Sequence, residues 1–127
     1  MILVDTSFLI AFFSKKDSQH EKAVEDMQKF DEKEEEFLIT EQILGETATV
    51  LLYYHGLEAA KQFIEFSKQK CTIQSWDDSD FSASLEIFEK QKWQLSYIDS
   101  TIVYLAKKLR VSVACYDGNI LKTIDRG

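Results

Sequence analysis

Four acidic residues of this sequence occupy positions that are unusual for acids whose only role is to keep the surface soluble. Asp5 and Asp117 come at the ends of short apolar runs, whereas Glu46 and Asp99 share predicted helix faces with apolar residues. Carboxylates gathered at one place repel each other, at about 3 kcal/mol for a pair ~5 Å apart in an effective dielectric of ~20. Divalent cations remove this cost, and an all-oxygen set of ligands suits Mg²⁺ or Mn²⁺. A cation held in this way can activate water and stabilise a phosphoryl transition state.

Two of these acids are expected at the carboxyl ends of strands. Residues 1–4 are apolar, too few for a helix and followed by a polar cluster, so they predict a buried strand that ends at Asp5. Residues 111–115 predict another strand, which leads to Asp117. The carboxyl ends of parallel strands meet at one edge of the sheet, where open α/β proteins bind their ligands. Each acid alone is also explained as a helix cap or a turn residue, most readily Asp117, because Gly118 follows it.

The other two acids belong to predicted helices. Asp99 lies in the first turn of a helix that begins at residue 96, on the same face as Ile102. Its alternative role is the acid of a capping box with Ser96. Glu46 lies in the middle of another helix, on the face that carries Ile43, where a buried carboxylate without partners is costly. Both positions direct a carboxylate toward the sheet.

The rest of the chain alternates between short strands and amphipathic helices. Helices are predicted over residues 8–13, 18–30, 41–56, 57–69, 96–109 and 119–124, with one more that begins at residues 77–79. Further strands are predicted over residues 37–40 and 71–75. We expect a capping box that starts at Ser18, and inward-facing positions for Tyr54, Phe81 and Phe88. This alternation predicts an α/β fold with parallel strands and helices on both faces of the sheet.

Length and composition narrow the class of protein. A chain of 127 residues predicts a single domain over residues 1–127, and no apolar run approaches the ~20 residues of a membrane span. The first strand begins at residue 2 without a preceding basic segment, so we expect a cytoplasmic protein. Cys71 and Cys115 form no CxxC pair, and we expect both to be reduced and buried. The net charge of −7 is unusual for a protein that binds nucleic acid.

Four short motifs around the acids resemble those of the PIN-domain ribonucleases, most nearly the small single-domain toxins of VapBC toxin–antitoxin pairs. They are Val4-Asp5-Thr6-Ser7, Glu46 within residues 43–47, Asp99 within residues 97–103, and Asp117 within residues 114–119. Each motif consists of one acid among apolar residues and is weak evidence by itself. The resemblance rests on the occurrence of all four motifs, in the same order, in a chain of this length. The resemblance extends over essentially the whole chain.

This resemblance implies a three-layer α/β/α sandwich with a central parallel sheet, and hydrolysis of RNA phosphodiester bonds that depends on Mg²⁺ or Mn²⁺. It implies that catalysis and metal binding rest on Asp5, Glu46, Asp99 and Asp117, with Ser7 and Asn119 in support. It also implies an RNA substrate, a small antitoxin protein as partner, and a homodimer. Asn119 stands where many relatives carry a further acid, and Cys115 stands where a threonine is frequent.

Basic and aromatic residues supply candidates for contacts with these partners. Lys15, Lys16 and Arg110 are the candidates for binding RNA phosphates. A dimer interface would draw on aromatic residues, although we expect core packing for most of them: Phe8, Phe12, Phe13, Tyr53 and Tyr54.

Other classes of α/β protein fit the sequence less well. A response-regulator receiver domain needs an acidic pair after its first strand, and a haloacid-dehalogenase-type phosphatase needs Asp-x-Asp. Here Asp5 is followed by Thr6 and Ser7. The alternative that stays open is a PIN-like module that binds or dimerises with weak or no catalysis. The net negative charge and Asn119 favour this alternative.

Overall fold

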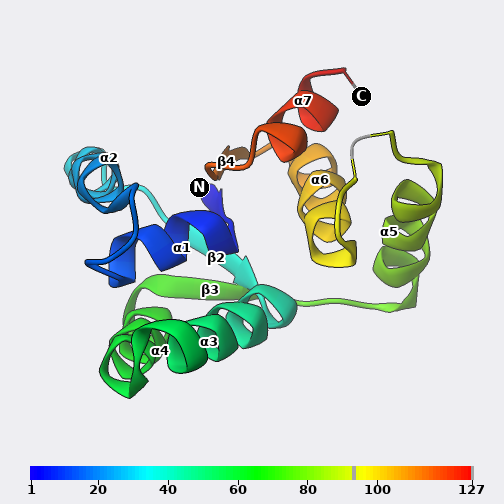
Figure 1. The fold of residues 1–127 in the computed structure, drawn as a ribbon. Helices are drawn as coiled ribbons and strands as arrows, with labels where there is room; N and C mark the ends of the chain where they lie inside the picture. The colour runs from blue at the N-terminus through cyan, green and yellow to red at the C-terminus, as the bar shows by residue number, and fades with distance from the viewer. Residues whose placement is uncertain (93, 127) are drawn as a thin grey trace.

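A parallel sheet of four short strands lies at the centre of the fold in the computed structural model, which describes residues 1–92 and 94–126 (Figure 1). The strands are β1 (Ile2–Val4), β2 (Phe37–Thr40), β3 (Cys71–Gln74) and β4 (Ser112–Ala114), in the order β3-β2-β1-β4. β1 has a neighbour on each side, with Leu3 opposite Leu38 on one and Val113 on the other. All the pairings are parallel, as predicted, so the carboxyl ends of the strands share one edge.

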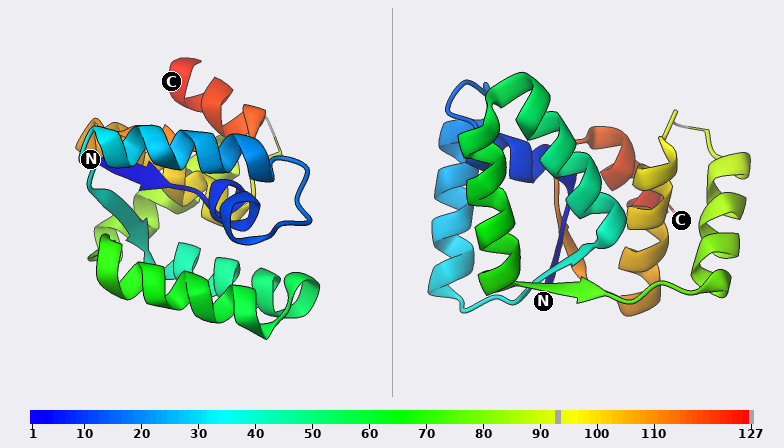
Figure 2. Two further views of the ribbon diagram at one scale, coloured as in Figure 1. Left: turned by 90° about the vertical axis from the view of Figure 1, so that its left-hand side faces the viewer. Right: turned by 90° about the horizontal axis from the view of Figure 1, so that it is seen from below.

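Helices cover both faces of this sheet (Figure 2). They are α1 (Thr6–Phe13), α2 (His20–Glu32), α3 (Glu41–His55), α4 (Leu57–Lys70), α5 (Asp78–Lys90), α6 (Tyr97–Leu109) and α7 (Gly118–Arg126). α3 and α4 pack together on one side of the sheet, α2 and α7 lie on the other, and α5 packs against α6. The predicted three-layer α/β/α sandwich is therefore confirmed. Among the described residues, none of these helices is both long enough and apolar enough to cross a membrane.

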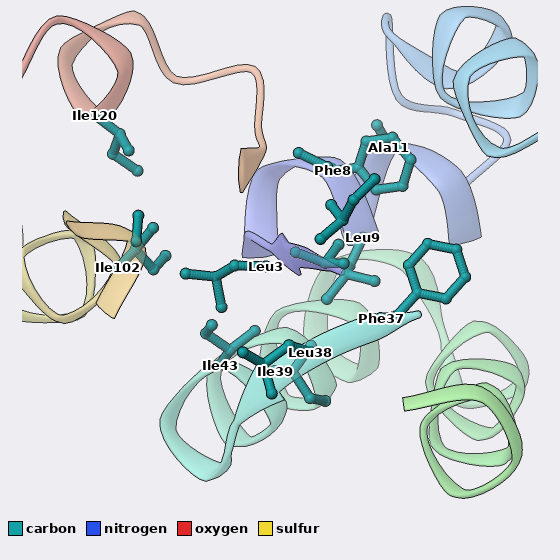
Figure 3. Close-up of a cluster of buried hydrophobic side chains, with 14 of the residues drawn as sticks. Leu3, Phe8, Leu9, Ala11, Phe37, Leu38, Ile39, Ile43, Ile102 and Ile120 are labelled. Atoms are coloured by element: carbon teal, nitrogen blue, oxygen red, sulfur yellow. The ribbon is translucent and has the colours of Figure 1, made fainter. Parts of the chain in front are cut away.

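The hydrophobic core fixes the helices that carry the acids against the central strand. Every residue of β1 is buried, as expected for a parallel strand that is covered on both faces. Figure 3 shows Ile102 of α6, Ile120 of α7 and Ile43 of α3 around Leu3 of β1. Burial of one such side chain contributes about 1.5–3 kcal/mol. This cluster therefore holds the three helices that begin near, or contain, the candidate acids.

Side-chain caps start several of the helices at the end of a preceding strand or loop. α5 and α6 begin with capping boxes at Asp77 and Ser96, and the second of these is the alternative role of Asp99 considered from the sequence. The capping box predicted at Ser18 is wrong, because α2 begins at His20 and its N-cap, Gln19, makes no side-chain cap bond. The carboxylate of Asp17 instead accepts a hydrogen bond from the backbone of Gln19 at 2.8 Å, which ends the preceding turn.

Three aromatic residues expected to face inward are exposed. The exposed fraction is 76% for Tyr54, 49% for Phe81 and 40% for Phe88. In α5 the buried positions are instead the polar residues Asp80 and Ser84, which are one helical turn apart. Asp80 takes this place because its carboxylate has partners on α6, and a polar contact of that kind leaves no trace in the apolar periodicity.

Candidate functional site

Asp5 lies at the carboxyl end of β1 and is the N-cap of α1. Its carboxylate Oδ2 accepts hydrogen bonds from the backbone of Ser7 at 3.2 Å and from the hydroxyl of Ser7 at 2.6 Å. Only 3% of the residue is exposed. Burial raises the pKa of Asp5 to about 6; the Ser7 bonds oppose this rise, and the charge of Asp99 adds to it. A nearby cation would therefore strongly stabilise the ionised form of this buried carboxylate.

Ser7 connects Asp5 to the loop after β4. Its Oγ donates to Asp5 and accepts a hydrogen bond from the backbone N–H of Tyr116 at 2.9 Å. The backbone N–H of Asp5 in turn donates to the carbonyl of Ala114 at 3.0 Å. These bonds fix the start of α1 relative to the loop that carries Asp117.

Asp99 occupies the third position of α6 and completes the capping box with Ser96. Its Oδ2 accepts from the backbone of Ser96 at 3.0 Å, and its own backbone N–H donates to the hydroxyl of Ser96 at 3.0 Å. The capping role considered from the sequence is thus real. It does not exclude a second role, because this bond involves one carboxylate oxygen and a carboxylate has about four lone-pair sites.

Asp117 stands in the loop between β4 and α7, where it caps α7. Its Oδ1 accepts hydrogen bonds from the backbone of Asn119 at 2.8 Å and of Ile120 at 3.3 Å. The side chain of Asp117 is half-buried, whereas Asn119 is exposed. Asp117 therefore caps a helix, as Asp99 does, and this capping role uses only one of its two carboxylate oxygens.

Three of the four acids act on the same neighbouring group. Burial raises the pKa of the Cys115 thiol to about 11, and the negative charges of Asp5, Asp117 and Asp99 add to this rise. The structure therefore brings these three carboxylates to one region of the carboxyl edge of the sheet. Both cysteines are free thiols, as expected from the sequence, but both are half-buried and not buried as predicted.

Glu46 lies on α3, half-buried, and its side chain forms no hydrogen bond or ion pair with any residue in the described part of the chain. Its neighbour Thr47 is buried and donates a hydrogen bond to Thr6 at 3.2 Å. Thr6 directly follows Asp5. This bond places the middle of α3 against the first turn of α1.

The chemistry of the donor set fits a hard divalent cation, although the side chains do not converge on one. Carboxylate oxygens are the ligands that Mg²⁺ and Mn²⁺ prefer. Over residues 1–92 and 94–126, however, no three side chains of the Asp, Glu, His and Cys types meet in a metal-binding arrangement. Asp99 and Asp117 face their own helix termini through the caps described above.

The basic residues proposed from the sequence lie away from this region. Arg110 follows the last residue of α6, about 16 Å along the helix axis from Asp99 at 1.5 Å per residue. Lys15 and Lys16 follow the far end of α1. Lys22 of α2 lies nearer, because its Nζ is 5.1 Å from the ring centre of Tyr116, the residue before Asp117.

Lys22 and Tyr116 were not identified from the sequence as residues that lie together near the acids. The hydroxyl of Tyr116 donates to Asp26 of α2 at 2.9 Å, so one aromatic ring links α2 to the loop that carries Asp117. Lys22 and Asp26 are one helical turn apart, which is the only local signal that they share a face. Nothing in the sequence indicates that Tyr116 packs between them.

Replacing Ser7 with alanine is expected to move the acid limb of the pH–rate profile upward by about one pH unit, if Asp5 acts as an anion. The hydrogen bond from the Ser7 hydroxyl lowers the pKa of Asp5, so its loss raises this pKa further above about 6, while the backbone bond from residue 7 remains. The measurement is kcat/KM, between pH 5 and 9, for the RNA cleavage that the resemblance implies, with the exposed Ser82→Ala as control. Superimposable profiles for wild type and Ser7→Ala would contradict this role.

Comparisons with known proteins agree with this fold. The family model described as PIN domain matches residues 2–126. VapC20 from Mycobacterium tuberculosis, described as a sarcin–ricin loop cleaving toxin, superimposes with a TM-score of 0.83 at 20% identity, over 96% of this chain and 94% of that one. FitAcB from Neisseria gonorrhoeae has a TM-score of 0.68 at 15% identity, over 98% of this chain and 94% of that one. No curated protein sequence matches the chain. At these identities the two structures show a shared fold.

Proposed function

Because the chain belongs to the PIN domain family, we propose that it is a divalent-cation-dependent endoribonuclease that hydrolyses RNA phosphodiester bonds. The observation that carries this proposal is the buried carboxylate of Asp5 at the end of the central strand, in the field of Asp99. A buried anion beside other anions is costly unless a cation compensates it. Buried charges that destabilise the fold in this way are found mainly at active sites.

The proposed roles follow from where each acid lies. Asp5 and Asp99 hold the cation, here Mg²⁺ or Mn²⁺, and Glu46 and Asp117 complete the site from α3 and from the loop after β4. When bound, the cation supplies positive charge that stabilises the negative charge developing on the phosphate oxygens. Ser7 fixes the orientation of Asp5, and Asn119 lies in support at the start of α7.

The proposed substrate is single-stranded RNA, brought to the acids past Lys22 and Tyr116. The net charge of −7 leaves little general attraction for phosphates, so a local cation matters more than it would on a basic protein. Lys22 is exposed and lies next to the loop of Asp117. Its position suits a contact with a phosphate that flanks the cleaved one.

We further propose a biological role as the toxin of a type II toxin–antitoxin pair, acting in the cytoplasm and inhibited by a small antitoxin. VapC20, which shares the fold, is described as a toxin that cleaves the sarcin–ricin loop. A homodimer is also proposed. Of the aromatics considered for its interface, Phe8, Phe12 and Phe13 pack in the core, whereas Tyr53 and Tyr54 are each 76% exposed beside the exposed Leu52 and Leu57.

The direct test is cleavage of total cellular RNA by the purified protein with Mn²⁺, with Mg²⁺ and with EDTA. Cleavage is expected with either cation, and loss of cleavage is expected with EDTA or in Asp99→Asn. The exposed Asp31→Asn serves as the matched control, because it removes one negative charge elsewhere. Cleavage at the wild-type rate by a folded Asp99→Asn would refute the assignment.

Thermal melting gives a second expected result that needs no knowledge of the RNA. A cation at about ten times its Kd adds about 1.4 kcal/mol to the free energy of unfolding, or several degrees in Tm for a domain of this size. This gain is expected for wild type and not for Asp99→Asn. Equal gains in the two proteins would place the cation elsewhere.

The alternative function is a PIN-like binding or dimerisation module with weak or no catalysis. The observation that favours it is the lack of three converging ligand side chains in the described residues. A cation-dependent rise in Tm without cleavage of any RNA in a broad panel would support this alternative over the ribonuclease.

A further inference from the structure

A pocket of about 620 Å³ opens at the same edge of the sheet as the acids, between the end of β3 and the first turn of α3. Its lining consists of Glu41, Gln42, Ile73, Gln74, Ser75 and Trp76. This volume lies within the roughly 300–1,000 Å³ of sites that bind small molecules. None of the proposed catalytic residues belongs to the pocket, so the ribonuclease mechanism leaves it unexplained.

Two of the residues that line this pocket each carry a buried polar atom without a partner. The side-chain oxygen of Gln42 and the indole N–H of Trp76 are buried, and neither forms a hydrogen bond within the described residues. An unsatisfied buried donor or acceptor costs about 1–3 kcal/mol, and such groups are rare in native proteins. Here an acceptor and a donor occur in the lining of one pocket. They obtain partners when a ligand binds and the amide and the indole turn toward it.

The pocket borders the helices that carry the acids. Gln42 precedes Glu46 by four residues, so the two side chains share a face of α3 about 6 Å apart along its axis. Trp76 contacts Tyr104 of α6, the helix of Asp99, in an edge-to-face arrangement with ring centres 5.8 Å apart. In Figures 1 and 2 the first turn of α3 lies beside α6. The pocket therefore adjoins both the helix of Glu46 and the helix of Asp99.

The chemistry of the lining selects a nucleobase over a phosphate. Its six residues include the exposed carboxylate of Glu41 and no Lys or Arg, which repels a phosphate. An aromatic ring, two amides and a carboxylate are the groups with which proteins hold unstacked bases of single-stranded RNA. The two oxygens of Glu41 match a base that offers two adjacent donors on one edge. Guanine does so through N1–H and the 2-amino group.

We propose that this pocket binds one unpaired guanine of the RNA substrate, next to the scissile phosphate, and so contributes to the choice of cleavage site. Glu41 accepts the two donors, and the indole N–H of Trp76 and the amide of Gln42 pair with the remaining polar atoms of the base. This inference rests on the proposed ribonuclease function and adds a substrate preference to it.

The test uses the fluorescence of Trp76 in the full chain. Trp93→Phe leaves Trp76 as the only tryptophan, because the sequence contains two. This variant is titrated with GMP, AMP, CMP and UMP in EDTA, so that no cleavage occurs. GMP is expected to change the emission at concentrations at least tenfold lower than UMP. Glu41→Gln is expected to abolish that preference, while Glu58→Gln, an acid in the first turn of the next helix, retains it.

Cleavage mapping supplies an independent readout. Cuts in a mixed RNA pool are expected to carry guanine at one fixed position beside the scissile bond for wild type and Glu58→Gln, and no such enrichment for Glu41→Gln. No response of Trp76 to any nucleotide up to 10 mM, or a response to basic peptides alone, overturns the guanine site. Cleavage without guanine enrichment also overturns the guanine site, but it agrees with the proposed ribonuclease function. Nucleotide binding by a protein that cleaves no RNA instead refutes the ribonuclease.

Discussion

Replacing Asp5 with asparagine is expected to reduce RNA cleavage by roughly three orders of magnitude and, at the same time, to raise Tm in the absence of divalent cations. The first effect follows because charge stabilisation by a bound cation is worth several kcal/mol, and each 1.36 kcal/mol is a factor of ten in rate. The second follows from burial of the charge, since Asp5 is only 3% exposed. Asparagine can still accept the bonds from Ser7 and still cap α1.

The size and pH dependence of the second effect come from the pKa of Asp5. Its folded-state value of about 6 lies above the unfolded-state value of 3.8, so the folded protein binds more protons between these values. The contribution of Asp5 to the free energy of unfolding is therefore most favourable below pH 4, and this contribution is lost as the pH rises through 6. Above pH 6 the penalty is about 3 kcal/mol by this conversion. The Asp5→Asn variant avoids it, and a gain of 1–3 kcal/mol corresponds to roughly 3–10 °C in Tm.

The measurement is Tm in EDTA from pH 4 to pH 8 for wild type, Asp5→Asn and the exposed control Asp31→Asn. The difference between Asp5→Asn and wild type is expected to grow between pH 4 and 6 and then to level off. Addition of Mn²⁺ is expected to raise Tm for wild type only, which narrows the difference. A variant that is less stable than wild type at pH 7.5, or one that still cleaves RNA at the normal rate, would contradict the assignment of Asp5.

Replacing Asp80 with alanine is expected to lower the free energy of unfolding by about 3 kcal/mol without touching the candidate site. Asp80 is buried at the start of α5, where its Oδ1 accepts hydrogen bonds from Tyr104 at 2.5 Å and from Lys108 at 2.7 Å, both on α6. It also completes the capping box with Asp77. Its removal weakens the cap of α5 and leaves the Tyr104 hydroxyl without its acceptor.

Urea denaturation of Asp80→Ala, Tyr104→Phe and the double variant measures this cluster. The double variant is expected to lose less stability than the sum of the two single variants, since both remove the same bond. Lys108 and Tyr104 hold the pKa of the Asp80 carboxyl well below its usual range, so its contribution is present at neutral pH and is lost as the solution becomes strongly acidic. Additive losses, or a loss for Asp80→Ala no larger than that for the exposed Asp78→Ala, would show that the cluster is not coupled.

Local patterns in the sequence were sufficient for the secondary structure and the arrangement of layers. Strands such as residues 2–4 and 37–40 are continuous apolar runs, and the helices between them have a 3.6-residue periodicity, so burial alone dictates a parallel sheet with two covered faces. The same patterns placed Asp5 and Asp117 at strand ends and Asp99 at a helix start, because these positions follow from where each element begins or ends.

The contacts between elements were decided only by the tertiary structure. The sequence did not show that Tyr116 links α2 to Ser7, that Asp80 pairs with α6, or that Gln42 and Trp76 lie in one pocket, because these partners belong to different elements and the bonded pairs are between 24 and 109 residues apart. Hydrogen bonds of this kind depend on direction and distance in space, whereas periodicity records only burial. For the same reason the sequence identified the four acids as a set, while the fold determined that three of them act on one region and that each of these three also caps a helix.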